Sequence, residues 1–196
     1  MNATETMTFK DQLLAHFEQQ LSTLYGQKEL RQDAAKIFEE QGFPTRKWED
    51  YKYINPEAVL KKGFGFRTEM MRGVTANDIT QFTLVKDAVV LVIVNGVYSA
   101  ELSVTKNLPK GITVTGIAEA VHSNEIAKKH FGKYASSKSD PFIALNTALN
   151  IGGVFIHIEK KTVSATPIQV LHISDNEVAS FFQPRNLIVA EEFSEA

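Results

Sequence analysis

The sequence has no cysteine among its 196 residues. The chain therefore cannot form a disulfide, use a thiolate nucleophile, ligate zinc as a zinc finger does, or hold an all-cysteine iron–sulfur cluster. Charge of one sign is also lacking, because 21 Lys and Arg against 23 Asp and Glu leave a net charge of −2. This balance argues against a protein that mainly neutralises phosphate backbones or anionic lipid, so we expect no nucleic acid or membrane as partner.

Long hydrophobic runs are missing as well. The longest, Ala88 to Val94, has seven residues, whereas a membrane-spanning helix needs about 20. The first 25 residues hold no apolar run of the kind found in signal peptides. Hydrophobic residues make up 43% of the chain and charged residues 22%, which is typical of a folded globular protein. We therefore expect a soluble protein of a reducing compartment, the cytoplasm.

Two helices are predicted near the N-terminus. Apolar residues within 9–24 recur every three or four positions, the spacing of one helical face. Thr8 is typical of an N-cap, and Tyr25-Gly26 predicts the end of this helix. A second helix is expected over residues 28–41 and should end at Gly42.

The clearest strand signal lies at residues 88–104. Asn95-Gly96 separates two runs rich in β-branched residues and favours a tight hairpin, because both residues tolerate a positive φ. A short strand is expected at residues 112–114 and a helix over residues 117–134. Residues 55–87 show no regular pattern and are predicted to be irregular.

The polar stretch SSKSD at residues 136–140 is the best candidate for a domain boundary. Asp140-Pro141 then begins a short helix through residue 149, since proline is tolerated at the first helical position. We therefore divide the chain into an N-terminal helical, α+β region at residues 1–140 and a strand-rich region at residues 141–196.

Short apolar strands separated by turn residues are expected at 154–158, 168–173 and 186–190. Their spacing suits either a β-sandwich or the rungs of a parallel β-helix. The sequence stops at Ala196 directly after the last strand, whose edge would be uncovered. Uncovered strand edges favour aggregation, so we expect that the sequence is truncated.

No constellation typical of an enzyme is found in the sequence. His157 and His172 lie in predicted strands and could face one another, but such residues are more often ordinary sheet histidines than metal ligands. Glu191 and Glu192 would point to opposite faces of a strand and would make a poor acid–base pair. The sequence GFG at residues 63–65 lacks the third glycine of a dinucleotide-binding loop. We expect no catalytic, cofactor-binding or metal-binding residue.

One local stretch departs from the average composition: GFPTRKWEDYKY at residues 42–53, here named the signature segment, which contains the only tryptophan. Tryptophan, tyrosine and arginine dominate the energetics of protein interfaces, so the segment could be a binding patch. Alternatively, its aromatic residues pack the N-terminal helices and leave the charges outside. The residues of this possible interaction or structural signature are Pro44, Thr45, Arg46, Lys47, Trp48, Glu49, Tyr51, Lys52 and Tyr53.

The signature segment resembles the Pro-Thr-Arg-Lys-x-Glu-x-Trp-Lys-Tyr signature of SufD proteins, in the SufB/SufD family of iron–sulfur cluster assembly proteins. Three further blocks agree in order: LVIVNGVYSAELS, PFIALNTALNIGGVFIHIEKKTVSATPIQVLHI and QPRNLIVAEEFSEA. The resemblance spans residues 42–196. Gly152-Gly153 stands where relatives often have Asp-Gly, and because both pairs fit a tight turn we expect the difference to be neutral.

The resemblance implies an α+β fold: an N-terminal helical region with a β-hairpin, then the first rungs of a right-handed parallel β-helix, with the rest truncated. It implies a non-catalytic, SufD-like scaffold subunit of the SufBCD complex, which pairs with a SufB-like paralogue and a SufC-like ABC ATPase and assists iron acquisition. The iron–sulfur cluster would be the product of that complex, with no cofactor bound by this segment. A homodimer through exposed strands would also be compatible with the sequence. A carbohydrate-active β-helix enzyme is the alternative, suggested only by the strand spacing.

Overall fold

The computed structural model describes the chain except for residues 1–6, 61–62, 67–72, 176 and 178. The fold is mixed α+β, as predicted, and its residues form two compact units that are each discontinuous in sequence. Unit 1 comprises residues 1–65 and 132–150, and unit 2 comprises residues 66–131 and 151–196. Neither unit begins or ends at residue 140, and the division into residues 1–140 and 141–196 stays a prediction.

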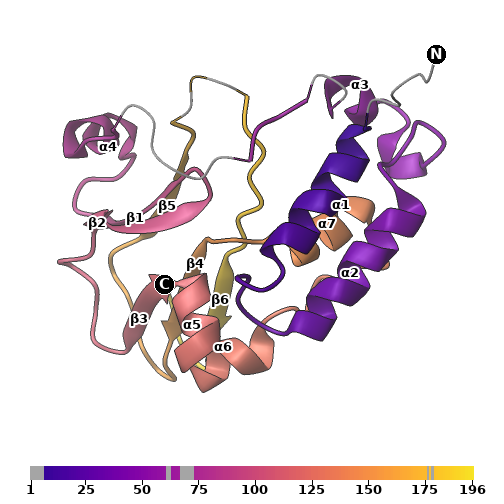
Figure 1. Cartoon of the computed structure of the whole chain (residues 1–196). Coiled ribbons are helices and arrows are strands. Elements are labelled where there is room, and N and C mark those ends of the chain that lie inside the picture. Colours follow the sequence, from indigo (N-terminus) through magenta and orange to yellow (C-terminus); the bar gives the residue numbers. More distant parts are fainter. Residues whose placement is uncertain (1–6, 61–62, 67–72, 176, 178) are drawn as a thin grey trace, which may run out of the picture. The chain divides into compact units, whose positions relative to one another are not determined.

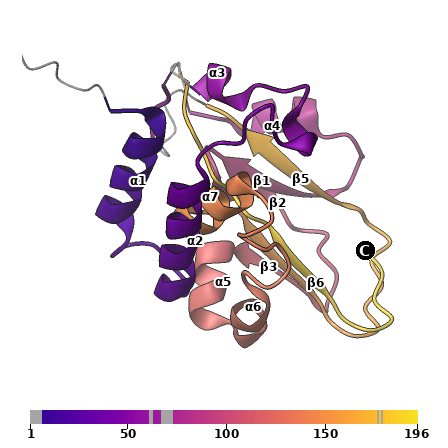
Figure 2. The same cartoon turned by 90° about the vertical axis from the view of Figure 1, so that its right-hand side faces the viewer.

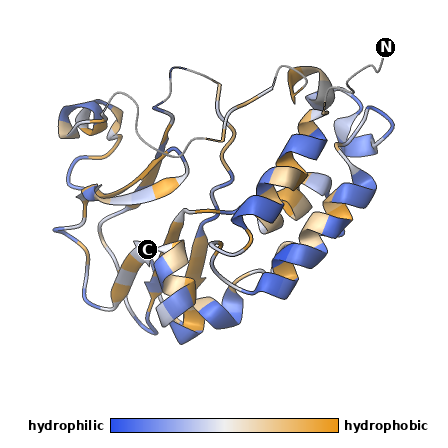
Figure 3. Ribbon diagram, in the orientation of Figure 1, coloured by the Kyte–Doolittle hydropathy of each residue, from blue (hydrophilic) through white to orange (hydrophobic). Residues whose placement is uncertain are grey.

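Unit 1 is helical. Its elements are α1 (Phe9–Gln20), α2 (Lys28–Gln41), the 3-10 turn η1 (Glu49–Tyr51), α3 (Pro56–Leu60) and α7 (Pro141–Leu149). Helices α2 and α7 lie side by side (Figure 1). Polar and apolar bands alternate along α1 and α2 (Figure 3), and the apolar side chains Leu13, Phe17 and Phe38 are buried. The helices are therefore held by their apolar faces, as the periodicity predicts.

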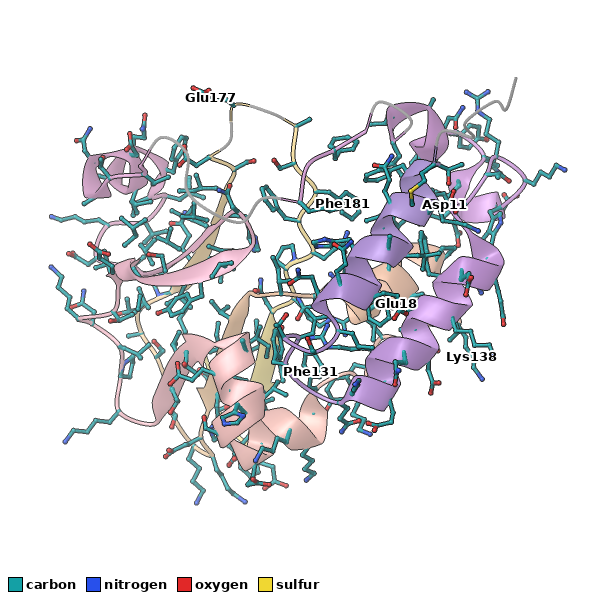
Figure 4. All side chains as sticks on the ribbon, in the orientation of Figure 1. Asp11, Glu18, Phe131, Lys138, Glu177 and Phe181 are labelled. Carbon is teal, nitrogen blue, oxygen red and sulfur yellow. The ribbon has the colours of Figure 1, made fainter. Side chains whose placement is uncertain are left out.

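Local sequence sets the ends of these helices. Thr8 caps α1: its hydroxyl accepts a hydrogen bond from the Asp11 amide, and the Asp11 carboxylate accepts one from the Thr8 amide (Figure 4). Helix α2 has its predicted bounds and ends at Gly42, where φ is 65°. Helix α1 ends earlier than predicted, because the amide and the hydroxyl of Thr23 both donate to the Gln20 carbonyl and close its last turn.

A buried arginine joins α2 to α7. Arg31 is 1% exposed, and its Nη1 donates to the carbonyl oxygens of Thr147 and Ala148 at 3.3 and 2.9 Å, in the last turn of α7. Its Nε donates to the Tyr25 carbonyl at 2.6 Å. A cation at a helix C-terminus also interacts favourably with the helix dipole. Arg31 thus fixes the C-terminal end of α7 against the first turn of α2.

The first sheet of unit 2 is centred on β1 (Val89–Val94), which pairs antiparallel with β2 (Val97–Val104) and parallel with β5 (Ile168–Ile173). Asn95 and Gly96 join β1 to β2 with φ angles of 50° and 86°, so the predicted hairpin is confirmed. Every residue of β1 is buried. Burial on both faces explains why its sequence is a continuous apolar run rather than an alternating one.

The second sheet is centred on β4 (Val154–Ile158). It pairs antiparallel with β3 (Ile112–Gly116) and parallel with β6 (Leu187–Ala190); Figure 2 labels β3 and β6. Side chains from alternate positions of β1 and β4 meet in one apolar core between the two sheets: Val89, Leu91, Ile93, Val154, Ile156 and Ile158. The predicted strands of the C-terminal region are confirmed to within one residue.

The parallel pairing extends well beyond β4 and β6. Gly152 pairs with Pro184, Phe155 with Leu187 and Val163 with Glu195, so each residue pairs with the residue 32 positions later. The same segment is crossed by backbone hydrogen bonds over its whole length, including Arg185 to Gly152 and Ser164 to Glu195. Residues 152–163 and 184–195 are therefore two parallel segments of the chain paired in one register, which we call the stacked coil.

Three short helices of unit 2 differ from the sequence-based expectation. Helix α4 (Ala76–Phe82) lies within the stretch predicted to be irregular, as α3 does in unit 1; residues 61–62 and 67–72 of that stretch lie outside the described residues. The predicted helix over residues 117–134 is broken into α5 (Ile117–Ser123) and α6 (Glu125–His130). The break occurs because the Asn124 side chain caps α6, accepting hydrogen bonds from two amides of its first turn.

Two glycines permit close approach of neighbouring backbone: Gly152 approaches the turn between β1 and β2, and Gly153 approaches the paired segment of the stacked coil. A Cβ atom at Gly152 would lie 2.4 Å from the Gly96 carbonyl oxygen, and one at Gly153 would lie 2.1 Å from the Arg185 carbonyl oxygen. Gly153 also has φ of 120°, which other residues rarely adopt. The expectation that Asp-Gly would be equivalent here is therefore wrong for this structure, because the aspartate Cβ would overlap a neighbouring backbone.

Replacing Gly153 with alanine should destabilise unit 2. The new methyl meets a carbonyl that cannot move without breaking the stacked coil, so we expect Gly153→Ala to lower the free energy of unfolding by about 3 kcal/mol or more. Chemical denaturation measures this change. The matched control is Gly63→Ala, where φ is 74° but no atom lies within 4 Å and about 1–2 kcal/mol is expected from backbone strain alone. Equal losses for the two variants would contradict the steric argument.

Candidate interaction surface

The signature segment is fixed to helix α7 by a tyrosine–aspartate contact. The Tyr51 hydroxyl donates to Asp140 Oδ2 at 2.6 Å, while Asp140 Oδ1 caps α7 by accepting hydrogen bonds from the amides of Phe142 and Ile143. The Phe142 ring also lies 6.0 Å from the rings of Tyr51 and Phe43. Two of the sequence blocks that carry the family resemblance are thus packed against each other within unit 1.

This environment raises the pKa of Tyr51 to about 12. Loss of hydration is the main cause, and the hydrogen bond to Asp140 and the negative charges of Asp140 and Asp50 add to it. Each of these disfavours the charged phenolate. Because the folded pKa lies above the ordinary value of 10.0, the stabilisation is complete below that pH and is lost as the pH rises through the folded value.

Of the other predicted residues of the signature segment, two are buried or half-buried and the rest are exposed. Pro44 is buried, and Trp48 is half-buried like Tyr51. The remaining ones are exposed: Thr45, Arg46, Lys47, Glu49, Lys52 and Tyr53. Glu49 and Lys52 form an ion pair with each other. The structural interpretation therefore accounts for Pro44, Trp48 and Tyr51, and a binding role of the exposed residues stays a prediction.

A second candidate surface is the outer edge of the stacked coil. Strands β5 and β6 each pair with one neighbour and form an edge of their sheets. Three large apolar side chains of the coil are exposed, namely Val163, Ile188 and Phe193. Within the described part of the chain no strand pairs with the other edge of β6, so its backbone groups are available to a further strand.

The two candidate histidines of the strands do not face one another. His157 Nε2 lies 2.9 Å from Glu191 Oε1, and the Lys160 amide donates to the other oxygen of Glu191 at 3.1 Å. His172, on β5 in the other sheet, has its Nε2 3.2 Å from the Asn186 side-chain nitrogen. Among the described residues, no group of three or more His, Cys, Asp or Glu side chains could hold a metal ion.

The His157 contact lowers the pKa of Glu191. The hydrogen bond from His157 is the largest cause, followed by the hydrogen bond from the Lys160 amide. Both hydrogen bonds favour the charged form of Glu191. Its carboxylate joins the segment that contains β4 to the segment that contains β6. Glu191 therefore connects the two paired segments of the stacked coil.

An open groove of unit 1 lies between α1 and α2. It has a volume of about 450 Å³ and is lined by Leu14, Phe17, Glu18, Gln32, Lys36 and Glu39, among others; Figure 4 labels Glu18. Its lining contains no histidine, serine or threonine.

Removing the Tyr51 hydroxyl should loosen the signature segment. We expect Tyr51→Phe to lower the free energy of unfolding by about 1–2 kcal/mol, because the hydrogen bond to a carboxylate is lost. Tyr53→Phe is the matched control, since Tyr53 is 89% exposed, and it should leave the stability unchanged. Thermal and chemical denaturation of both variants measure the difference, and a Tyr51→Phe protein as stable as the wild type would contradict the anchoring role.

The Tyr51→Phe variant also tests the raised pKa. In a spectrophotometric titration of phenolate, the absorbance lost in Tyr51→Phe relative to the wild type should titrate at about 12. If this difference curve titrates instead at the ordinary value of 10.0, Tyr51 is not in contact with Asp140 in solution.

Acid should remove the contribution of Glu191 to the stability of the folded protein. A carboxyl group with a lowered folded pKa stabilises the protein above its unfolded pKa and loses this effect as the pH falls through the folded value. We expect Glu191→Gln to lower the melting temperature at about pH 7 and to approach the wild type as the pH falls through the folded pKa of Glu191. Glu192→Gln, which removes only an exposed contact to Lys160, should stay close to the wild type at about pH 7. A difference for Glu191→Gln that does not depend on pH would contradict this account.

Comparison with known proteins agrees with the resemblance in the sequence. Residues 7–170 match the family described as SufBD protein N-terminal region. An iron–sulfur cluster assembly SufBD family protein of Staphylococcus aureus strain USA300 is 34% identical over 84 residues, and one of Staphylococcus haemolyticus is 33% identical over 84 residues. These matches cover 42% of this chain and 18% of each relative. No described helix has both the length and the hydrophobicity to span a membrane. With most of its residues matched by the family's N-terminal region, the chain belongs to the SufBD family.

Proposed function

We propose that this chain is the N-terminal part of a SufD-like scaffold subunit in iron–sulfur cluster assembly. It would bind a SufB-like paralogue and a SufC-like ABC ATPase, assist iron acquisition and catalyse no reaction itself. The family match carries the link to cluster assembly, and the signature segment favours SufD over SufB. The cluster is then the product of the complex, and this part of the chain needs no cofactor of its own.

We also propose that the stacked coil is the beginning of a right-handed parallel β-helix. The constant spacing of 32 residues between paired positions is the single observation that supports this most, because equal windings in one register are the repeating unit of such a fold. Parallel pairing of β1 with β5 and the core shared by the two sheets support it further. A scaffold function fits, since a stack of windings offers long edges to a similar partner.

The SufB-like paralogue is the proposed partner, and a homodimer through exposed strands is the other arrangement. If the β-helix continues, its next winding would pair with the edge of β6, so the partner would contact the outward-facing apolar side chains of the coil, such as Ile188. The carbohydrate-active alternative gains no support, because Glu191 contacts His157 and Glu192 contacts Lys160. Localisation in the cytoplasm stays a prediction.

Affinity purification tests the proposed function. The protein is tagged at its N-terminus in its own chromosomal gene, and the proteins that purify with it are identified by mass spectrometry. We expect a SufB-like protein and an ABC ATPase in amounts similar to the bait. A bait that purifies alone, or only with copies of itself, would contradict the proposal.

A surface variant distinguishes a specific complex from non-specific binding. Ile188→Lys places a charge on the exposed face of β6 without touching the buried core, and it should reduce the yield of the SufB-like partner if that face is used. Val97→Lys is the control, since Val97 is also exposed but lies on β2. Equal yields for wild type and both variants would contradict the use of this face.

A further inference from the structure

Three large apolar side chains are exposed close together after η1. Tyr53 is 89% exposed, Ile54 57% and Val59 55%. Single exposed apolar residues are ordinary on protein surfaces, but a group of them within seven residues suggests a contact surface. We call these three residues together with Arg46 and Lys47 the docking face.

The backbone that carries the docking face is ordered by consecutive turns. The Trp48 amide donates to the Thr45 carbonyl, the Tyr51 amide to the Trp48 carbonyl and the Ile54 amide to the Tyr51 carbonyl. Tyr51 is in turn fixed to Asp140. Because the surface is already held in one conformation, a partner does not have to order it on binding, which lowers the entropic cost.

The positive charges of the docking face have no partner within the described residues. The side chains of Arg46 and Lys47 are exposed and make no hydrogen bond or ion pair there. Of the two carboxylates that follow in the sequence, Glu49 forms an ion pair with Lys52. The charge of Asp50 acts on Tyr51, whose pKa it raises. The face therefore offers two cations beside an apolar group.

We propose that the docking face binds an acidic segment of another protein that also carries apolar side chains. Carboxylates of the segment would pair with Arg46 and Lys47, and its apolar side chains would cover Tyr53 and Ile54.

The number of charges favours a protein partner over nucleic acid or membrane. Nucleic-acid binding at physiological salt relies on roughly 6–10 phosphate contacts, and basic lipid-binding clusters contain about 4–8 Lys or Arg. The docking face has two unpaired cations and an apolar group of similar extent, in a chain of net charge −2. Apolar contact with a small charged rim is the usual composition of a protein interface.

Photocrosslinking in the full-length protein tests this proposal. A photoreactive phenylalanine analogue replaces Tyr53 in the chromosomal gene, and the crosslinked segment of the partner is mapped by mass spectrometry. We expect a protein segment that contains both carboxylates and apolar side chains. Arg46→Glu with Lys47→Glu should reduce the crosslinked product about tenfold, because like charges then oppose each other.

The control changes charge by the same amount on another part of unit 1. Lys28→Glu with Lys36→Glu alters two exposed lysines of α2 and should leave the crosslink unchanged. Replacing the mapped carboxylates of the partner with lysine should restore crosslinking to the Arg46→Glu, Lys47→Glu protein. A crosslink to nucleic acid, to lipid or to a segment without carboxylates would overturn the proposal, as would no crosslink at all. The result does not depend on the proposed Suf complex, since the partner is identified by its segment.

Discussion

The constant register of the parallel backbone pairing is the constraint on which the strand-rich part of this protein depends. From Gly152 to Val163, each paired residue meets the residue 32 positions later. This register places alternate residues of β4 in the core opposite β1, because a shift by one position would turn the apolar side chains outward. Gly152 allows a close approach to the turn between β1 and β2, and Gly153 allows a close approach to Arg185 in the paired segment. The Glu191 carboxylate joins the two paired segments through its contacts with His157 and the Lys160 amide.

The helical unit depends on polar contacts of a different kind. Arg31 binds the last carbonyls of α7, and Tyr51 binds the aspartate that caps the other end of the same helix. Buried polar groups are costly unless they are paired, so such contacts specify one arrangement of the helices. They also determine which side chains remain outside: Arg46, Lys47 and Tyr53 are left on the surface because Tyr51 is held inward.

Local signals in the sequence predicted most of the elements. Thr8 with Asp11, Asn95-Gly96 and Asp140-Pro141 act within a few residues, and each begins a helix or a turn as expected. Thr75 and Asp78 form the same capping box before α4. This signal is present in the sequence, but residues 55–87 were predicted to be irregular. Contacts between distant residues could not be read from a single sequence: Tyr51 is 89 positions from Asp140. The close approach of Gly152 to Gly96 could not be predicted from the sequence either. For this reason the sequence alone did not show that aspartate at position 152 would overlap a neighbouring backbone.

The family match links the chain to iron–sulfur cluster assembly, and the parallel pairing in one register supports the proposed β-helix. The most direct test is electron cryomicroscopy of the complex purified with the full-length protein from its own cells. We predict further windings in the 32-residue register of residues 152–195, beside a SufB-like subunit and an ABC ATPase. A structure in which the outer edges of β5 and β6 face solvent and no such subunits are present would contradict the account.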